Sequence, residues 1–194
     1  MKKKNFKKTA ISFLLLASYF SYGQTFKTYL DIPNVDGEYV TPARNAKTLN
    51  GPKANNILLN KFSFAEGSTT SYGSNTIFFG RPGTIKQITV KFRIDKATPK
   101  IYDLFFNHTI IPYLNIYKDV VASPQREVER YKLSDVIISS ILIESNENQI
   151  PTASVTFTYD KILRATIFQT AMGSLDLLTY CYDFSANVTC NDVF

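Results

Sequence analysis

Residues 85–107 read IKQITVKFRIDKATPKIYDLFFN, and two different periodicities meet within this stretch. Its first half alternates apolar and polar residues, which is the period-two pattern of a β-strand with one buried face. Its second half changes to a helical period, since Ile101, Leu104, Phe105 and His108 fall at positions i, i+3, i+4 and i+7. A strand followed at once by a one-sided helix predicts a sheet against which the helix packs.

The expected helix begins with two common start signals. Thr98 is of a type that caps helices, and Pro99 would occupy the first helical position, where its missing N–H costs nothing. About ten residues are too few for a stable isolated helix in water. Burial of Ile101, Leu104 and Phe105 against the sheet, at roughly 1.5–3 kcal/mol for each side chain, is therefore expected to hold it.

The first 23 residues have the pattern of a secretory signal peptide. Five lysines precede an apolar segment at 10–20, and Ser21-Tyr22-Gly23 supplies the small-x-small pattern of a cleavage site. We expect cleavage before Gln24 and a mature protein in the periplasm or outside the cell, without stable membrane insertion. An uncleaved anchor is the alternative, although the apolar segment is shorter than the ~20 residues that span a bilayer.

The charge of the mature chain argues against a nucleic-acid partner. The whole chain has 22 basic and 16 acidic residues, so loss of the five signal lysines leaves 17 basic residues and a net charge of +1. Phosphate binding needs a concentrated positive face, which this balance does not indicate. The 171 residues from Gln24 to Phe194 fit one domain with a sizeable core.

The two cysteines, Cys181 and Cys190, are predicted to form a disulfide, because an exported chain leaves the reducing cytoplasm. The bond would close a loop of about ten residues and stabilise the fold by about 2.5–3 kcal/mol in the chain-entropy model. A reactive or metal-binding thiol pair is the alternative. Its nine-residue spacing matches no ligand motif, and the one histidine is far away in the sequence.

The rest of the mature chain predicts short strands separated by turns. Residues 136–143 are apolar on both faces, as in a buried central strand, whereas residues 65–75 are polar and predict an exposed loop. The expected fold is mainly β: a compact antiparallel β-barrel or sandwich of about eight strands with one α-helix packed at its side. This domain is assigned to residues 24–169, and residues 170–194 to a C-terminal extension. The expected strands are 29–33, 57–64, 77–79, 85–94, 110–118, 127–132, 136–143 and 153–159.

Four segments, in order and in register, resemble the Hcp family, the tube proteins of type VI secretion systems. They are IDKATPK at 94–100, YLDIPNVDGE at 29–38, YKLSDVIISS at 131–140 and SVTFTYDKI at 154–162. The family motif falls on Asp95, Lys96, Thr98 and Pro99. The match covers about residues 28–168, so the C-terminal extension lies outside it.

The resemblance implies a non-enzymatic structural protein. Six copies would close into a hexameric ring, rings would stack into a tube, and further secretion components or secreted effectors would be partners. An exported stand-alone binding or adhesion module on the same fold is the alternative. The place of the family's ring-stacking loop falls on Glu66, Gly67, Ser68, Thr69, Thr70, Ser71, Tyr72 and Gly73.

No set of residues predicts an enzyme or a cofactor. His108 is interpreted as a capping or partly buried structural residue, since no Ser-His-Asp order, metal-ligand cluster or phosphate-binding loop accompanies it. Glu127 and Glu129 would share one strand face and are interpreted as a solvated face with Arg126 and Arg130. The 15 phenylalanines and 12 tyrosines allow a sugar-binding platform, but tryptophan is missing and many of them fall at inward strand positions.

Overall fold

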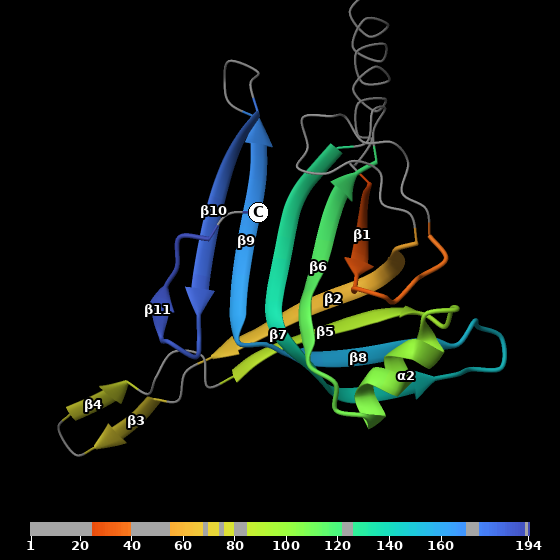
Figure 1. The fold of residues 1–194 in the computed structure, drawn as a ribbon, viewed down its shortest axis with the longest axis horizontal. Coiled ribbons are helices and arrows are strands. Elements are labelled where there is room, and N and C mark those ends of the chain that lie inside the picture. Colours follow the sequence, from red (N-terminus) through yellow and green to blue (C-terminus); the bar gives the residue numbers. More distant parts are fainter. Residues whose placement is uncertain are drawn as a thin grey trace, which may run out of the picture.

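The computed structural model describes residues 25–39, 55–67, 70–73, 76–79, 85–121, 126–169, 175–192 and 194. Within these residues the chain forms strands and one helix (Figure 1), which confirms the mainly β fold with a single helix at its side. The predicted signal peptide lies outside the described residues. The elements are β1 (Phe26–Asp31), β2 (Ile57–Gly67), β3 (Thr70–Gly73), β4 (Thr76–Phe79), β5 (Ile85–Arg93), α2 (Thr98–Phe106), β6 (Ile111–Val120), β7 (Arg126–Glu144), β8 (Thr152–Thr158), β9 (Lys161–Gln169), β10 (Leu175–Asp183) and β11 (Val188–Thr189).

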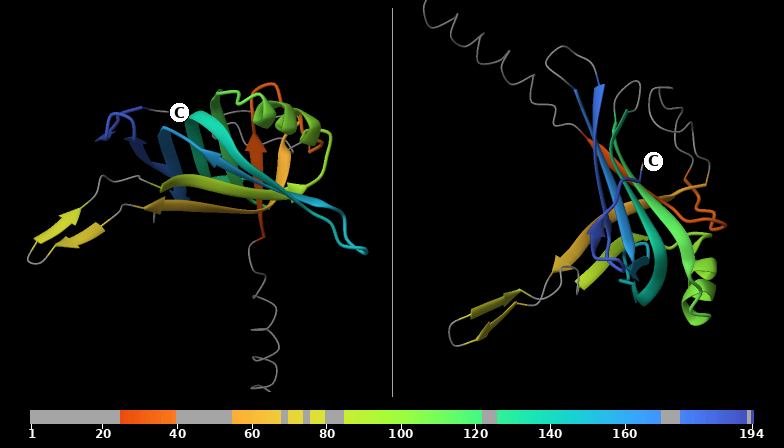
Figure 2. Two further views of the ribbon diagram at one scale, coloured as in Figure 1. Left: turned by 90° about the horizontal axis from the view of Figure 1, so that it is seen from below. Right: turned by 60° about the vertical axis from the view of Figure 1, so that its left-hand side comes forward.

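Nine strands form one antiparallel sheet that closes on itself in part. Its order is β11-β10-β9-β7-β6-β1-β2-β5-β8, and β7 pairs with β8 in addition. This additional pairing joins β7, β6, β1, β2, β5 and β8 into a circuit, which is how a barrel removes its sheet edges. Strands β9, β10 and β11 continue the sheet outward from β7 (Figures 1 and 2).

Strand β7 closes the circuit because it is long and bends. Its first half pairs with β6 and β9, and its second half pairs with β8. Ile138 lies opposite Phe157 and Ser140 lies opposite Thr156, so Ser139 is an extra residue without a partner position. Such a β-bulge bends a strand and increases its twist. The bend carries β7 from one side of the barrel to the other.

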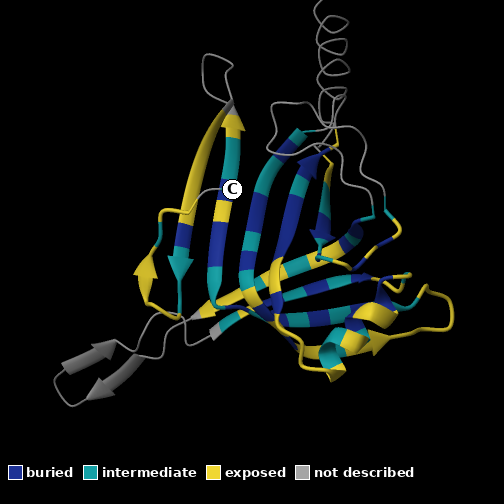
Figure 3. Ribbon diagram, in the orientation of Figure 1, coloured by how far each residue is buried: buried dark blue, intermediate teal, exposed yellow. Residues whose placement is uncertain are grey.

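The core fills the space inside this circuit, as the predicted alternation requires (Figure 3). In β5 the side chains of Ile88, Val90 and Phe92 are fully buried, and Val155 and Phe157 of β8 lie opposite them. The polar residues between them are partly or fully exposed. The strand predicted from residues 85–94 is therefore confirmed for residues 85–93, and its inward face is as expected except at Ile94, which follows the strand and is exposed.

Helix α2 packs its predicted apolar face against the core, and the deepest residue is Ile101. Ile101 is buried, and Leu104 and Phe105 are half-buried against the same cluster. His108 is exposed and has a positive φ of 49°. Its N–H donates to the Phe105 carbonyl at 3.1 Å, and the Thr109 N–H donates to the Leu104 carbonyl at 3.0 Å. This is a Schellman cap, so the capping role of His108 is confirmed, although it acts through the backbone.

The predicted helix start is wrong by one residue. Thr98 is itself the first helical residue, Pro99 is the second, and the N-cap position is Ala97, which has no capping side chain. Proline is tolerated there as well, because the first turn leaves its N–H groups unpaired within the helix. Among the described residues, no helix combines the length and the apolar character that a membrane crossing needs.

The described residues of the segment 65–75 form strands, where the sequence predicts a loop, and residues 68, 69, 74 and 75 lie outside the described residues. Glu66 and Gly67 continue β2 and pair with Lys86 and Ile85 of β5. Residues 70–73 form β3, which pairs with β4 in a separate two-stranded hairpin that projects from the main sheet (Figure 2). The polar composition of this segment predicts a loop, but pairing with a neighbouring strand stabilises a β-strand more than the polarity of its own side chains does.

The prediction of a buried strand at 136–143 is also wrong for its second half. Leu142 is 58% exposed and Ile143 is 37% exposed, although Val136 and Ile138 are buried. The end of the β7–β8 hairpin extends beyond the barrel core, so Leu142 and Ile143, which point to opposite faces of β7, are both exposed. Apolar residues on both faces therefore do not mark a central strand here.

Replacing Ile101 by alanine tests the helix packing. Because Ile101 is buried in the core, Ile101→Ala is expected to lower the free energy of unfolding by about 3 kcal/mol. Phe106 lies on the same helix and is 70% exposed, so Phe106→Ala is the matched control, with an expected loss of about 1 kcal/mol or less. Urea unfolding of both variants measures the difference. Equal losses would mean that the helix face is wrongly assigned.

Candidate functional site

The residues singled out in the sequence lie at three separate places and do not converge on one cleft. The family motif lies between β5 and the first turn of α2, and the two cysteines join β10 to the residue that follows β11. Of the expected stacking segment, Glu66 and Gly67 end β2 and residues 70–73 form β3, whereas Ser68 and Thr69 lie outside the described residues. Each place has its own contacts, which determine what it can do.

The motif between β5 and α2 builds a tight turn around Asp95. The Ala97 N–H donates to the Asp95 side-chain carboxylate at 3.0 Å, and the Thr98 N–H donates to the Asp95 carbonyl at 3.1 Å. The Asp95 N–H in turn donates to the Thr98 hydroxyl at 3.2 Å. Burial raises the pKa of Asp95, against the hydrogen bond from Ala97 that lowers it. The Asp95 carboxylate thus stabilises the turn that precedes the first residue of the helix.

The same turn contacts a second family segment, residues 29–38. The Lys96 N–H donates to the Glu38 carboxylate at 3.3 Å. Next to Glu38, the Gly37 N–H donates to the Asn55 carbonyl at 2.7 Å, and a Cβ at Gly37 would lie 2.2 Å from the Asn56 carbonyl oxygen. Only glycine fits so close to this backbone. The segments 94–100 and 29–38, which are far apart in sequence, therefore contact each other and stabilise one turn region. These contacts are structural and involve no activated nucleophile.

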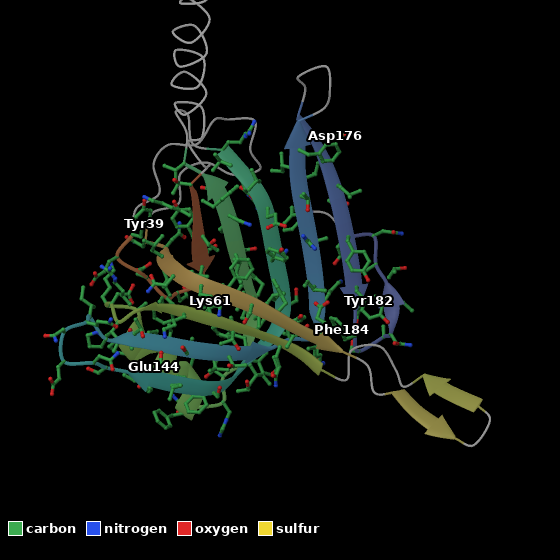
Figure 4. The ribbon with its side chains drawn as sticks, turned by 180° about the vertical axis from the view of Figure 1, so that it is seen from behind. Tyr39, Lys61, Glu144, Asp176, Tyr182 and Phe184 are labelled. Atoms are coloured by element: carbon green, nitrogen blue, oxygen red, sulfur yellow. A yellow bond between two sulfur atoms is a disulfide. The ribbon has the colours of Figure 1, made fainter. Side chains whose placement is uncertain are left out.

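Glu66, assigned from the sequence to the stacking loop, anchors the end of β2 to the core. The Tyr159 hydroxyl donates to its carboxylate at 2.9 Å, and burial together with this carboxylate raises the pKa of Tyr159. Tyr182 and Phe184, at the end of β10, lie near this end of β2 (Figure 4), and Phe184 packs edge-on against Tyr159 at 5.7 Å between ring centroids. The base of the β3–β4 hairpin is thus fixed to the sheet.

Cys181 and Cys190 form the predicted disulfide, with 5.0 Å between their Cα atoms. Asp192 completes a group of three potential ligand atoms within 4.8 Å of one another. A metal would need thiolate sulfurs, and both sulfurs are bonded to each other. This group therefore does not fit a metal ion, and the alternative of a metal-binding thiol pair is not supported.

The interpretation of Glu127, Glu129, Arg126 and Arg130 as one solvated face is wrong. Glu127 and Arg130 are buried, and they form a bidentate ion pair of 2.7 and 2.8 Å. Lys118 lies opposite Glu129 and Asp119 lies opposite Glu127, so Val128 is an extra residue in β7. This bulge turns Glu127 onto the face of Arg130, although a spacing of three residues would otherwise place them on opposite faces. A prediction that assumes regular alternation along the strand cannot detect this bulge or the ion pair that it allows.

Glu129 lies on the other face of β7, in a second charged group. Its carboxylate accepts from Arg164 at 2.7 Å and lies 3.6 Å from the Lys118 ammonium. The Tyr131 hydroxyl is 3.3 Å away, and burial raises the pKa of Tyr131 to about 12, with the negative charge of Glu129 as a further cause. The carboxylate is fully engaged by cations, so it is not placed to act as a general base.

Two of the cavities that open on the described surface are lined mainly by polar and charged residues, and neither contains a catalytic set. The first, about 340 Å³, lies beside the C-terminal residues, and the second, about 430 Å³, lies at the end of the β7–β8 hairpin. A nucleophile beside a general base is the usual minimum for covalent catalysis. The single histidine lines neither cavity. Their lining residues are Lys132, Ser134, Lys161, Leu163, Asn191 and Asp192 in the first, and Lys91, Ile143, Glu144, Ser145, Asn146, Gln149, Ile150 and Thr152 in the second.

Comparison with known structures places this fold among type VI secretion proteins. A structure described as a type six secretion system protein is 17% identical, with a TM-score of 0.68, and the match covers 86% of this chain and all of that one. Hcp1 from Salmonella typhimurium is 16% identical, with a TM-score of 0.61, over 85% of this chain and 99% of the other. A type VI secretion system effector from Yersinia pestis is 17% identical, with a TM-score of 0.55, over 80% and 98%. At these identities the likeness establishes the fold.

Among curated proteins, none matches this sequence significantly. The family model for the type VI secretion system effector Hcp matches residues 29–164. This range includes β2, β5, β6, β7 and β8 of the circuit, the second half of β1, the helix, and the two motifs that meet at Lys96 and Glu38. The chain belongs to the Hcp family of type VI secretion system proteins.

Proposed function

We propose that the mature protein is a non-enzymatic subunit of a type VI secretion tube, and that six copies close into a ring. The observation that carries the proposal is the family match over residues 29–164, which includes the second half of β1 and all the other strands of the closed circuit. The function of such a subunit is to present surfaces to its neighbours. Catalysis needs a constellation of reactive groups, and the described cavities offer none.

Ring closure needs a heterologous contact, in which one surface of a subunit meets a different surface of the next. Among the described residues, large apolar side chains are exposed at several places, including Phe106 and Ile110 beside the helix, and two of these places suit a head-to-tail contact. Figure 3 colours the backbone at β10 and at the end of the β7–β8 hairpin as largely exposed. Leu178 and Tyr180 of β10 are 68% and 55% exposed, and Leu142 and Ile150 at the end of the β7–β8 hairpin are 58% and 57% exposed. These places lie on opposite sides of the molecule (Figures 1 and 2). Such a disposition supports a head-to-tail ring.

Light scattering and negative-stain microscopy of residues 24–194, under oxidising conditions, test the ring. We expect a mass of six subunits and a ring-shaped particle. Leu178→Arg is expected to raise the protein concentration needed for assembly at least tenfold, because an exposed apolar side chain on β10 would become a charge. Thr179→Arg, which changes the next and also exposed residue on the other face of β10, is the matched control. A mature protein that stays monomeric at high concentration would favour the stand-alone module.

The projecting β3–β4 hairpin is proposed to join one ring to the next. It forms a sheet of its own and is absent from the pairings of the nine-stranded sheet, so its removal need not disturb the barrel. Gly67 and Ile85 lie opposite each other at the ends of β2 and β5. A two-residue Asn-Gly turn can therefore replace residues 68–84, since such turns connect directly paired strands.

The hairpin replacement is expected to leave single rings intact and to abolish their stacking. Electron microscopy counts stacked rings, and thermal unfolding of the barrel is the control for correct folding. Tubes of unchanged length would assign stacking to another surface, while loss of the rings themselves would place the hairpin in the ring contact.

Export before assembly is proposed from the signal-peptide pattern and the C-terminal disulfide. Structural disulfides persist mainly in oxidising compartments, and this one lies outside the matched residues 29–164. The same observation favours the second candidate function, an exported binding module. Intact mass of the secreted protein is expected to show cleavage before Gln24 and no free thiol. A retained signal or two alkylated cysteines without reductant would contradict export through this route.

A further inference from the structure

Residues 190–192 and Phe194, which we call the tail, pass over the outer face of the sheet, which we define by Tyr117, Arg130, Leu163, Ala165 and Cys181. Register places Tyr117, Arg130 and Ala165 in one row across β6, β7 and β9, and Leu163 and Cys181 two positions along. All five residues are buried, although they point away from the barrel core. The tail supplies part of the cover on this face.

The centre of the covered face is the buried ion pair of Arg130 and Glu127. The guanidinium lies between two aromatic rings, with its central carbon 4.7 Å from the Tyr117 centroid and 5.3 Å from the Phe194 centroid. Arg130 is only 2% exposed. Tyr117 belongs to the sheet itself, whereas Phe194 belongs to the tail. One side of the guanidinium is therefore shielded by the sheet and the other by the tail.

The disulfide is the strongest link that holds the tail in place. Strand β11 pairs with β10 at only two positions, Tyr182 with Thr189 and Asp183 with Val188, and both β11 residues are exposed. So short an exposed ladder is marginally stable by itself. The Asp192–Lys161 ion pair, at 2.5 Å, is partly exposed and contributes little. Cys190 follows in the same register opposite Cys181, so the covalent bond fixes the ladder from which the tail starts.

We propose that the tail, residues 190–192 with Phe194, is a redox-gated cover, which closes over Arg130 only while the Cys181–Cys190 bond is intact. A dithiol reductant opens it. One reductant thiolate attacks the Cys190 sulfur, which is more exposed than the buried Cys181 sulfur, and Cys181 leaves as a thiolate that takes a proton. The second reductant thiol then displaces Cys190, so that the reductant becomes a cyclic disulfide and two electrons and two protons reach the protein.

Opening the cover exposes a cationic and aromatic surface made of Arg130 and Tyr117, while the barrel core stays closed. The cover lies outside the family match at residues 29–164, so this inference does not rest on the proposed ring. It gives the C-terminal extension a defined role: it shields the buried ion pair after the chain has entered an oxidising compartment.

Arginine labelling tests the cover. Protein comprising residues 24–194 is treated with phenylglyoxal, with and without dithiothreitol, and the modification of each arginine is followed by peptide mass spectrometry. We expect Arg130 to react at least tenfold faster after reduction. Arg164, whose side chain is 48% exposed and whose partner Glu129 lies on the other face, is the internal control and should react equally in both states.

Three variants separate the cover from general unfolding. The double variant Cys181→Ser, Cys190→Ser should show fast Arg130 labelling without reductant. Phe194→Ala should also expose Arg130 while the disulfide remains, because it removes the shielding ring alone. Phe184→Ala changes an aromatic residue of the β10–β11 turn that does not contact Arg130, and it should leave the labelling slow.

Amide exchange of β5 and β8, measured on the same samples, must stay slow for the labelling to report the cover. Slow labelling of Arg130 in the reduced protein would overturn the proposal, and so would fast labelling in the oxidised one. Fast exchange throughout the barrel after reduction would overturn it as well, since the disulfide would then support the whole fold. None of these outcomes depends on whether the protein forms rings.

Discussion

The pairing of β7 with three other strands is the interaction on which the rest of the structure depends. Its first half lies between β6 and β9, its second half pairs with β8, and helix α2 packs against it. The bulge at Ser139 bends the backbone of β7 near the point where its pairing partners change from β6 and β9 to β8. One strand can therefore pair with all three. Without this bend, β8 would remain an edge, and the core between β5 and β6 would open to water.

The sequence predicts the parts of this fold that follow from local alternation. The buried row of Ile88, Val90 and Phe92, the amphipathic helix and the disulfide are all readable from the order of residues. The β3–β4 hairpin and the ion pair of Glu127 and Arg130 are not. Both depend on which strand lies opposite, and a bulge at Val128 reverses the faces that alternation would assign. The family motif identifies the turn between β5 and α2 that contains Asp95, but it does not predict the contact of this turn with Glu38.

The two charged groups on β7 lie on opposite faces of the sheet and differ in their burial. Glu129 faces the barrel side with Arg164 and Lys118, where it is partly exposed. Glu127 and Arg130 face outward and are nevertheless buried. Burying such a pair is costly unless its hydrogen bonds are satisfied and water is kept out. The bidentate contact satisfies these hydrogen bonds, and the rings of Tyr117 and Phe194 shield the guanidinium from water. Because Phe194 belongs to the C-terminal segment, that segment contributes to the burial of the ion pair.

An engineered cross-link tests the closure of the circuit most directly. Leu142 of β7 lies opposite Ser154 of β8, so the variant Leu142→Cys, Ser154→Cys is expected to form a second disulfide on oxidation of the folded protein. Leu142→Cys, Thr156→Cys offsets the pair by two residues and should cross-link far less. Peptide mapping under non-reducing conditions measures both. Efficient cross-linking of the opposed pair alone is the predicted result, and equal yields or a preference for the offset pair would contradict the closed circuit.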